Sequence, residues 1–236
     1  MFAFDDSLVP PEHRACEKGL RPRWITLFEK LGINPAATAP LYADLVLRYT
    51  APSRFYHDLQ HVADVLAASD RLRSEVEDPL ALQLAIWFHD AIYHTDGSVD
   101  NELLSAEFAV AELEKLGVAA DCRQTVHALI LDTRHREPPQ TQDGRVIVDA
   151  DLSTFAVPPA RFDRHSADVR REFSHVPADL YCSSRITILT GMLARDHFYY
   201  TKTMCERHEE QARANLKRGI EQLKRGDLTF GVGQEV

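Results

Sequence analysis

Two histidines four residues apart are the first feature of this sequence that could do chemistry. His57 and His61 lie in the segment RFYHDLQHVADV, and this spacing would put both imidazoles on one face of a helix. Val65, Ala68 and Leu72 continue that face, so we expect it to point toward the interior. Paired imidazoles on a helical face can bind a metal ion. The alternative is that each imidazole hydrogen-bonds a backbone carbonyl in the core.

A second polar pair follows a helix that is apolar on nearly every face. The segment LALQLAIWFHD ends on His89 and Asp90. Burying a carboxylate without a partner is costly, so Asp90 should be hydrogen-bonded, paired or bound to a cation. The structural alternative is an Asp90 held by an arginine or by a helix N-terminus, with His89 as its hydrogen-bond partner.

The third element is a pair of carboxylates, Asp149 and Asp151, behind the short apolar run VIV. Helix N-capping by either residue is the structural alternative. Together with the two earlier motifs, they complete the ordered series His, His-Asp, Asp. Mixed imidazole and carboxylate ligands suit Zn, Mn, Fe(II), Co or Ni, and bridging carboxylates allow a second, harder ion such as Mg. The series therefore predicts a site for one or two divalent metal ions.

This series resembles the HD superfamily of metal-dependent phosphohydrolases, over about residues 57–151. The segment YHDLQHVADV is similar to the YHNxxHAxDV signature of the cyclic-nucleotide phosphodiesterases of that superfamily, and ADLS at 150–153 is similar to their ADLS. The resemblance implies that His57 is the general acid and that Asp90 can bridge two ions. It implies four metal ligands: His61, His89, Asp90 and Asp151.

The sequence departs from the family patterns at several positions, which narrows the substrates that the resemblance implies. Asp58 replaces the signature Asn, and HDAIYH at 89–94 lacks both the HDxDHxG continuation of the phosphodiesterases and the His-Asp-Glu-Asp of alarmone hydrolases. Cyclic-nucleotide cleavage is therefore not implied. The layout is more similar to that of small bacterial proteins described only as predicted HD phosphohydrolases.

This likeness implies hydrolysis of a phosphate ester in a small phosphorylated metabolite by metal-bound hydroxide, with a nucleotide as the preferred candidate. One alternative is a non-catalytic HD-fold domain that uses its metal for stability or ligand sensing. The other is an HD-type di-iron oxygenase.

Three arginines are candidates for contacts with substrate phosphate: Arg54, Arg134 and Arg185. Arg185 lies in the inward-facing helical stripe of Tyr181, Leu189 and Met192, where a buried ion pair with an aspartate is the alternative. For Arg54 and Arg134 the alternative is a solvated surface position.

Further residues could assist the site. His127 or His135 could bind a second metal, and Asp149 would support a ligand or cap a helix. Glu102 begins a helix, where the dipole alone favours an acidic residue. Its functional alternative is to position water.

The elements that carry these residues are expected to be helices, because apolar residues recur at spacings of three and four and strand patterns are nearly absent. We predict an all-α, single HD-type domain of about nine helices over 1–226, with its motif core at 54–153 and a frayed tail at 227–236. Asp78 and Asp100 should cap helices, and Gly32 and Gly117 should end them. The expected helices cover 12–31, 35–49, 58–76, 79–92, 101–116, 120–132, 159–173, 178–198 and 204–223.

One break interrupts the helical pattern. Residues 134–145 contain Pro138-Pro139 and Asp143-Gly144 in a polar run, which predicts a mobile loop near the chemistry.

Composition narrows the classes of partner. The 236 residues are 44% hydrophobic with a net charge of −9, which is typical of a compact protein and disfavours nucleic-acid polymers and anionic membranes. The most apolar stretch, 80–88, is about half as long as a membrane helix. The first residues lack a signal-peptide pattern, and the four cysteines are widely spaced. We therefore expect a cytoplasmic protein with no membrane partner.

Overall fold

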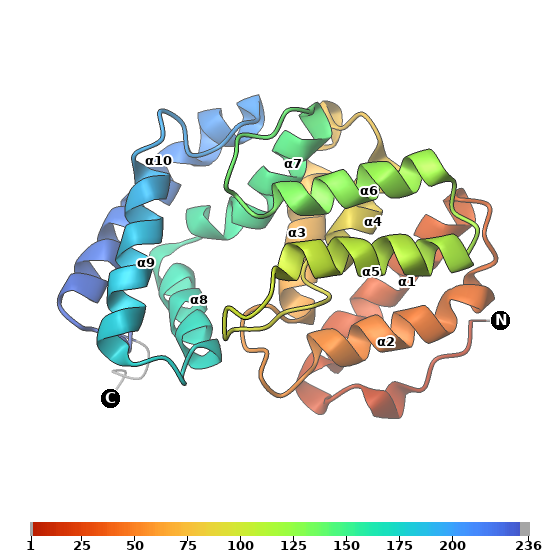
Figure 1. The fold of residues 1–236 in the computed structure, drawn as a ribbon, viewed down its shortest axis with the longest axis horizontal. Coiled ribbons are helices and arrows are strands. Elements are labelled where there is room, and N and C mark those ends of the chain that lie inside the picture. The colour runs from red at the N-terminus through yellow and green to blue at the C-terminus, as the bar shows by residue number, and fades with distance from the viewer. Residues whose placement is uncertain (1, 232–236) are drawn as a thin grey trace. The chain divides into compact units, whose positions relative to one another are not determined.

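The computed structural model describes residues 2–231, which contain ten α-helices, five short 3-10 helices and no strand (Figure 1). The all-α prediction is confirmed, with one helix more than expected. The chain divides into two compact units, 1–150 and 151–236. This boundary follows the last helix of the first unit rather than lying in the predicted loop. The division does not test the predicted single domain over 1–226, which stays a prediction.

The first unit contains seven helices, the last of which ends one residue beyond the boundary. They are α1 (Arg14–Lys30), α2 (Ala39–Tyr49), α3 (Leu59–Arg71), α4 (Pro79–Phe88), α5 (Asn101–Lys115), α6 (Ala120–Asp132) and α7 (Gln142–Asp151). The second unit contains α8 (Pro159–Glu172), α9 (Ala178–Leu193) and α10 (Lys202–Lys224).

Local signals at several helix ends act as the sequence predicts. The carboxylate of Asp78 accepts the backbone N–H groups of Leu80 and Ala81, at 3.1 and 3.0 Å, and begins α4. Asp100 likewise accepts the N–H of Leu103 at 3.0 Å and begins α5. Gly117, with φ +77°, follows α5 in the left-handed conformation that terminates helices.

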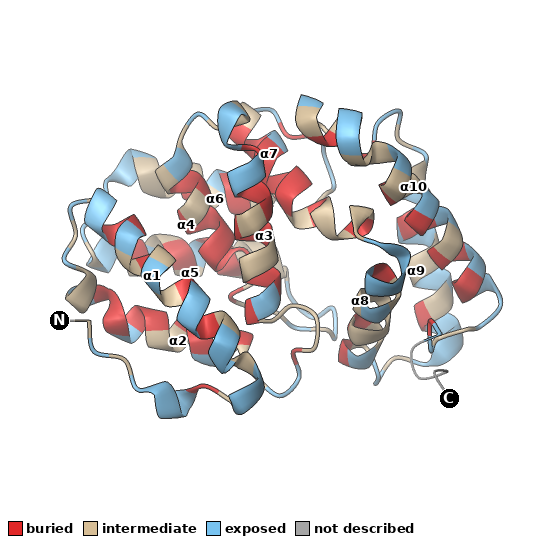
Figure 2. Ribbon diagram, turned by 180° about the vertical axis from the view of Figure 1, so that it is seen from behind, coloured by how far each residue is buried: buried red, intermediate tan, exposed pale blue. Residues whose placement is uncertain are grey.

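Helix α4 lies at the centre of the first unit. All of its residues from Leu84 to Phe88 are buried, and Figure 2 shows it as a largely buried helix. Trp87 packs edge-on against Trp24 of α1 and Tyr42 of α2, with ring centroids 5.1 and 6.0 Å apart. Helices α5 and α6 run antiparallel beside each other, and α6 also packs on α4 (Figure 1). This packing fixes the point at which α4 ends and the His89-Asp90 pair begins.

The loop predicted at 134–145 is wrong for its last four residues, because α7 begins at Gln142. Asp143 accepts the backbone N–H groups of Glu77 and Asp78, both at 2.8 Å, so a contact distant in sequence holds the first turn. A Cβ on Gly144 would lie 2.3 Å from Oδ2 of Asp132, so this glycine permits a close approach rather than ending a helix.

In the second unit, α10 packs against α9 and the 3-10 helix Leu152–Ala156. The side-chain amide of Asn215 donates to the carbonyls of Phe155 and Val157, both at 2.8 Å. Phe230 is buried, and the frayed tail stays a prediction for residues 227–231. Residues 232–236 lie outside the described residues.

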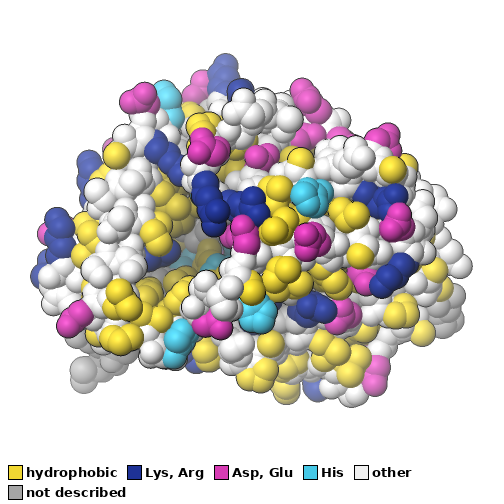
Figure 3. Space-filling view, viewed as in Figure 1, with side chains coloured by type: hydrophobic (Ala, Val, Ile, Leu, Met, Phe, Trp, Pro, Cys, Tyr) yellow, Lys and Arg dark blue, Asp and Glu magenta, His cyan; other side chains and the backbone are white. Residues whose placement is uncertain are grey.

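Among the described residues, no helix combines the length and the apolar character that spanning a membrane requires. All four cysteines are free thiols. On the face drawn in Figure 3, Lys and Arg side chains are interspersed with Asp and Glu rather than gathered in one extended basic surface.

Candidate metal centre

The first histidine motif lies at the start of α3. Oδ1 of Asp58 accepts the N–H groups of Gln60 and His61, at 2.8 and 3.1 Å, so Asp58 is the N-cap and the helix begins at Leu59. His57 therefore precedes the helix, and the predicted common helical face is wrong. Its ring nevertheless lies near that of His61, with centroids 5.7 Å apart.

The second motif lies just beyond the end of α4. The helix stops at Phe88 rather than continuing to residue 92, and the N–H of Ala91 turns back to the carbonyl of Phe88 at 3.0 Å. His89 is 2% exposed, and its Nδ1 donates to the carbonyl of Ile86 at 2.9 Å. Because a carbonyl can only accept, the proton of the neutral imidazole is on Nδ1 and the lone pair is on Nε2. Metal-binding histidines are commonly oriented in this way.

The two motifs converge. Nε2 of His61 lies 3.2 Å from Nε2 of His89. Oδ2 of Asp90 lies 3.1 Å from Nε2 of His89 and 3.5 Å from Nε2 of His61. Asp151, the last residue of α7, joins them: His61, His89 and Asp151 each offer a ligand atom within 4.8 Å of the others. The structure thus brings together all four residues that the resemblance implies as ligands.

These distances fit a metal ion. Bonds of about 2.0–2.1 Å from an ion to nitrogen place neighbouring ligand atoms about 2.8–3.0 Å apart in octahedral geometry and about 3.3–3.4 Å apart in tetrahedral geometry. The separation of 3.2 Å between the imidazole nitrogens of His61 and His89 lies between these two ranges. Unprotonated nitrogens and a carboxylate oxygen repel one another unless a proton or a cation lies among them. Two imidazoles favour Mn, Fe, Co, Ni or Zn over Mg.

The charge of Asp90 suits this role. Burial raises the pKa of its carboxyl group, but the charge and hydrogen bond of a protonated His89, with the charges of protonated His57 and His61, lower that pKa. When the imidazoles are neutral and bind a metal, the ion would supply the positive charge that keeps Asp90 ionised. An ionised carboxylate is the form that binds a cation.

The alternative capping roles of the two late carboxylates are wrong. Asp149 lies inside α7, near its C-terminal end, and is fully buried, so it cannot be a helix N-cap. Asp151 precedes the 3-10 helix Leu152–Ala156 but its side chain does not cap it.

Arg54 differs from both of its sequence-based interpretations. It is 9% exposed, so a solvated surface position is wrong. Its Nη1 donates to the carbonyls of His57 and Asp90, at 2.9 and 2.6 Å, and its Nη2 donates to the carbonyl of Ala91 at 3.2 Å. The guanidinium is thus engaged by the backbone, which does not support the predicted phosphate contact.

The other two arginines occupy different settings. Arg134 pairs with Asp100 through two contacts, Nε to Oδ1 at 3.1 Å and Nη2 to Oδ2 at 2.8 Å, and Asp100 also caps α5. Arg185 is half-buried on α9, and its charge lowers the pKa of Tyr181, although burial raises that pKa overall. Contacts of Arg134 and Arg185 with a phosphate stay predictions.

Glu102 is the remaining acidic candidate. It lies in the first turn of α5, and burial, together with the charge of Asp90, raises the pKa of its carboxyl group. The predicted role of Glu102 in positioning water stays a prediction.

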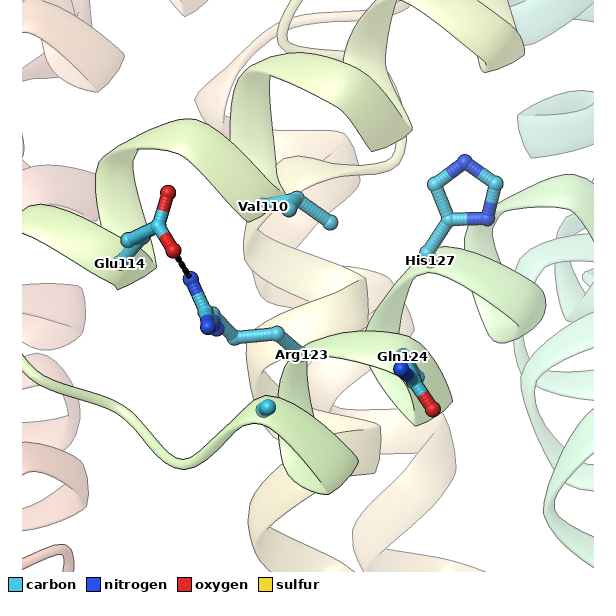
Figure 4. A pocket seen from close by; sticks show the side chains of 6 residues that line it. Val110, Glu114, Arg123, Gln124 and His127 are labelled. Carbon is cyan, nitrogen blue, oxygen red and sulfur yellow. Dashed lines mark ion pairs between the residues drawn. The ribbon is translucent and has the colours of Figure 1, made fainter.

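His127 and His135 are the candidate histidines for a second metal, and that role stays a prediction. His127 lines a surface hollow of about 350 Å³ between α5 and α6, where Arg123 pairs with Glu114 at 2.5 Å (Figure 4). His135 follows α6 with φ +56°. Within residues 2–231, neither belongs to the ligand group of His61, His89 and Asp151.

Two tyrosines at the site were not predicted. The ring of Tyr93 stacks on that of His57, with centroids 4.1 Å apart. The hydroxyl of Tyr49 donates to the carbonyl of Trp87 at 3.1 Å and accepts the N–H of Asp90 at 3.3 Å. The position of Tyr93, four residues after His89, is the one sequence feature that could have placed it near the site. Tyr49 lies forty-one residues before Asp90, and no sequence feature links the two.

No family model matches this chain, and no curated protein matches it either. The resemblance to the HD superfamily therefore depends on the motif residues of the sequence.

Proposed function

We propose that this protein is a metal-dependent hydrolase. The observation that carries the proposal is the convergence of Nε2 of His61, Nε2 of His89 and Oδ2 of Asp90 within 3.5 Å of one another, with Asp151 beside them. Two imidazole nitrogens and a carboxylate oxygen in such contact can bind one cation together.

Within that class we propose an HD-type phosphohydrolase acting on a small phosphorylated metabolite, with a nucleotide as the preferred substrate. The ligands follow the order His, His-Asp, Asp along the chain, as in the HD series. The net charge of −9 disfavours a nucleic-acid polymer as substrate. We propose a cytoplasmic setting because no cysteine is used in a disulfide.

The proposed chemistry divides among a few groups. His61, His89, Asp90 and Asp151 would hold the ion, which supplies a water of lowered pKa and neutralises phosphate charge. His57 would donate a proton to the leaving alkoxide. Tyr93, stacked on His57, restricts that imidazole to one ring plane. Glu102 would accept a hydrogen bond from the attacking water.

The test is metal analysis of the purified chain, followed by a phosphate-release screen over nucleotides, sugar phosphates and cyclic nucleotides with Mn, Mg, Co and Ni. We expect metal bound in stoichiometric amount and turnover of at least one substrate, both lost in His89→Ala. Full metal occupancy with no turnover of any ester would favour the non-catalytic domain. Iron with substrate-dependent oxygen consumption would favour the oxygenase.

A further inference from the structure

We infer that Arg54 is a positioning residue of the metal centre, which fixes Asp90 relative to the segment that leads into His61 by binding the main-chain carbonyls of both. This inference depends on the proposed metal site and concerns how the chain assembles it. Arg54 itself contacts no proposed ligand atom; it acts through the backbone.

The first observation is the set of carbonyls left without helical partners. The last carbonyls of a helix, and those just beyond it, have no intrahelical donor. Because α4 stops at Phe88, the carbonyls of Asp90 and Ala91 need donors from elsewhere. Arg54 supplies both, at 2.6 and 3.2 Å, from thirty-six and thirty-seven residues away in the sequence.

The second observation is that one nitrogen connects the two motifs. Nη1 of Arg54 donates to the carbonyl of Asp90 and also to that of His57, at 2.9 Å. His57 immediately precedes Asp58, whose side chain caps the turn that carries His61. The separation of the Asp90 carboxylate from the His61 imidazole, 3.5 Å, therefore depends on a backbone that Arg54 holds on both sides.

The third observation is that Arg54 is itself held in place. Its guanidinium carbon lies 5.1 Å from the ring centroid of Tyr49 and 5.3 Å from that of Tyr93. Both distances are in the range of cation–π contacts. Lysine could not make the same set of contacts, because the three carbonyls are bound by two nitrogens of a planar group and lysine has only one nitrogen.

The backbone at Ile92 and His94, which continues the segment after Ala91, is hydrogen-bonded by side chains of α5. Oγ of Ser105 accepts the N–H of Ile92 at 3.0 Å and donates to its carbonyl at 3.2 Å. The side chain of Asn101 makes the same pair of contacts with His94, both at 2.9 Å. Helix α5 thus fixes the far end of the segment, and Arg54 fixes the end that carries the ligand.

The experiment compares Arg54→Lys and Arg54→Met with wild type in the full chain. Arg23→Met is the matched control, because Arg23 pairs on the surface with Asp70 at 2.8 Å. Equilibrium dialysis measures the dissociation constants of Mn²⁺ and Co²⁺, and the visible spectrum of bound Co²⁺ reports ligand geometry. We expect Arg54→Met to bind metal about 10–100-fold more weakly, the usual cost of losing a group that orients a ligand. Arg54→Lys should also be weakened, with an altered Co²⁺ spectrum, and Arg23→Met should match wild type.

A general loss of folding is separated from a positioning role by chemical rescue. Arg54→Gly should regain part of its Co²⁺ affinity and spectrum in low millimolar methylguanidinium, which would not restore a chain that is simply unfolded. Wild-type affinity and spectrum in Arg54→Met would overturn this inference alone. A wild-type chain that binds no metal would overturn the proposed function and this inference together.

Discussion

Helix α7 carries a buried carboxylate, Asp143, near its start and a half-buried one, Asp151, at its end, and their surroundings differ. At its start, Asp143 faces two backbone N–H groups, those of Glu77 and Asp78, both at 2.8 Å. At its end, Asp151 faces the imidazoles of His61 and His89, whose Nε2 atoms are 3.2 Å apart. The carboxylate of Asp143 is bound by backbone donors of the fold, whereas that of Asp151 lies beside two imidazoles with which it could share a metal ion. The kind of group beside a carboxylate distinguishes a structural acid from a candidate ligand.

The largest expected effect comes from removing the candidate metal ligands that lie in the first unit. His61→Ala, His89→Ala and Asp90→Ala should each lose most bound metal and nearly all activity, because losing one ligand disrupts both affinity and geometry. Metal analysis and phosphate release measure this. His175→Ala is the control, because His175 is exposed on the surface. Stoichiometric metal in all three variants would contradict the ligand assignment.

The next effect concerns His57, which contacts the site without belonging to the proposed ligand set. His57→Ala should keep metal near the wild-type amount but lower turnover by about 10²–10⁴-fold, the range for a positioned proton donor. The loss should be much smaller with p-nitrophenyl phosphate, whose phenolate leaves with little need of a proton, than with a substrate that releases a sugar alkoxide. Equal slowing of both substrates, or loss of metal, would exclude the general-acid role.

A smaller difference should separate the two carboxylates at the end of α7. Asp149→Asn should weaken metal binding about tenfold if Asp149 supports the site from behind, and Asp151→Asn should weaken it further. Competition with a chelator measures both affinities. A larger effect of Asp149→Asn would reverse the assignment that the ADLS resemblance implies.

The smallest effect on the site is expected at the start of α7. Asp143→Ala should lower the free energy of unfolding by about 1–3 kcal/mol, because it leaves two partly buried N–H groups without their acceptor. Metal content should not change. Urea denaturation tests this, with Asp5→Ala as the control, because Asp5 accepts a backbone N–H from Ser7 on the surface. If Asp143→Ala lost its metal while its stability stayed unchanged, Asp143 would be a part of the metal site and not a structural acid.

The sequence predicted the types of the site residues better than their local structure. The residues that the resemblance implies as ligands, His61, His89, Asp90 and Asp151, lie close together, and their role as ligands stays a prediction. The position of His57 was wrong because helical spacing was extended across Asp58, which ends the pattern as an N-cap. Such an N-cap preference is a local signal and should carry more weight than spacing.

Two other features depend on contacts that no local pattern records. Helix α7 begins inside an apparent Asp-Gly turn because Asp143 binds backbone that lies sixty-six residues earlier. Arg54 is buried because the end of α4 leaves carbonyls that only a distant donor can satisfy. Sequence periodicity identifies which faces are apolar, but it does not show which backbone groups will lack partners.

The hydroxyl of Tyr49 connects the aromatic core to the site. Its ring is buried in the core, and its oxygen contacts both the carbonyl of Trp87 and the N–H of Asp90. The placement of Asp90 therefore depends on how the rings around Trp87 are packed. A substitution that loosens this packing should therefore weaken metal affinity as well as lower the melting temperature. Adaptation of this protein to heat or cold would then proceed by repacking its aromatic centre while the ligands stay the same.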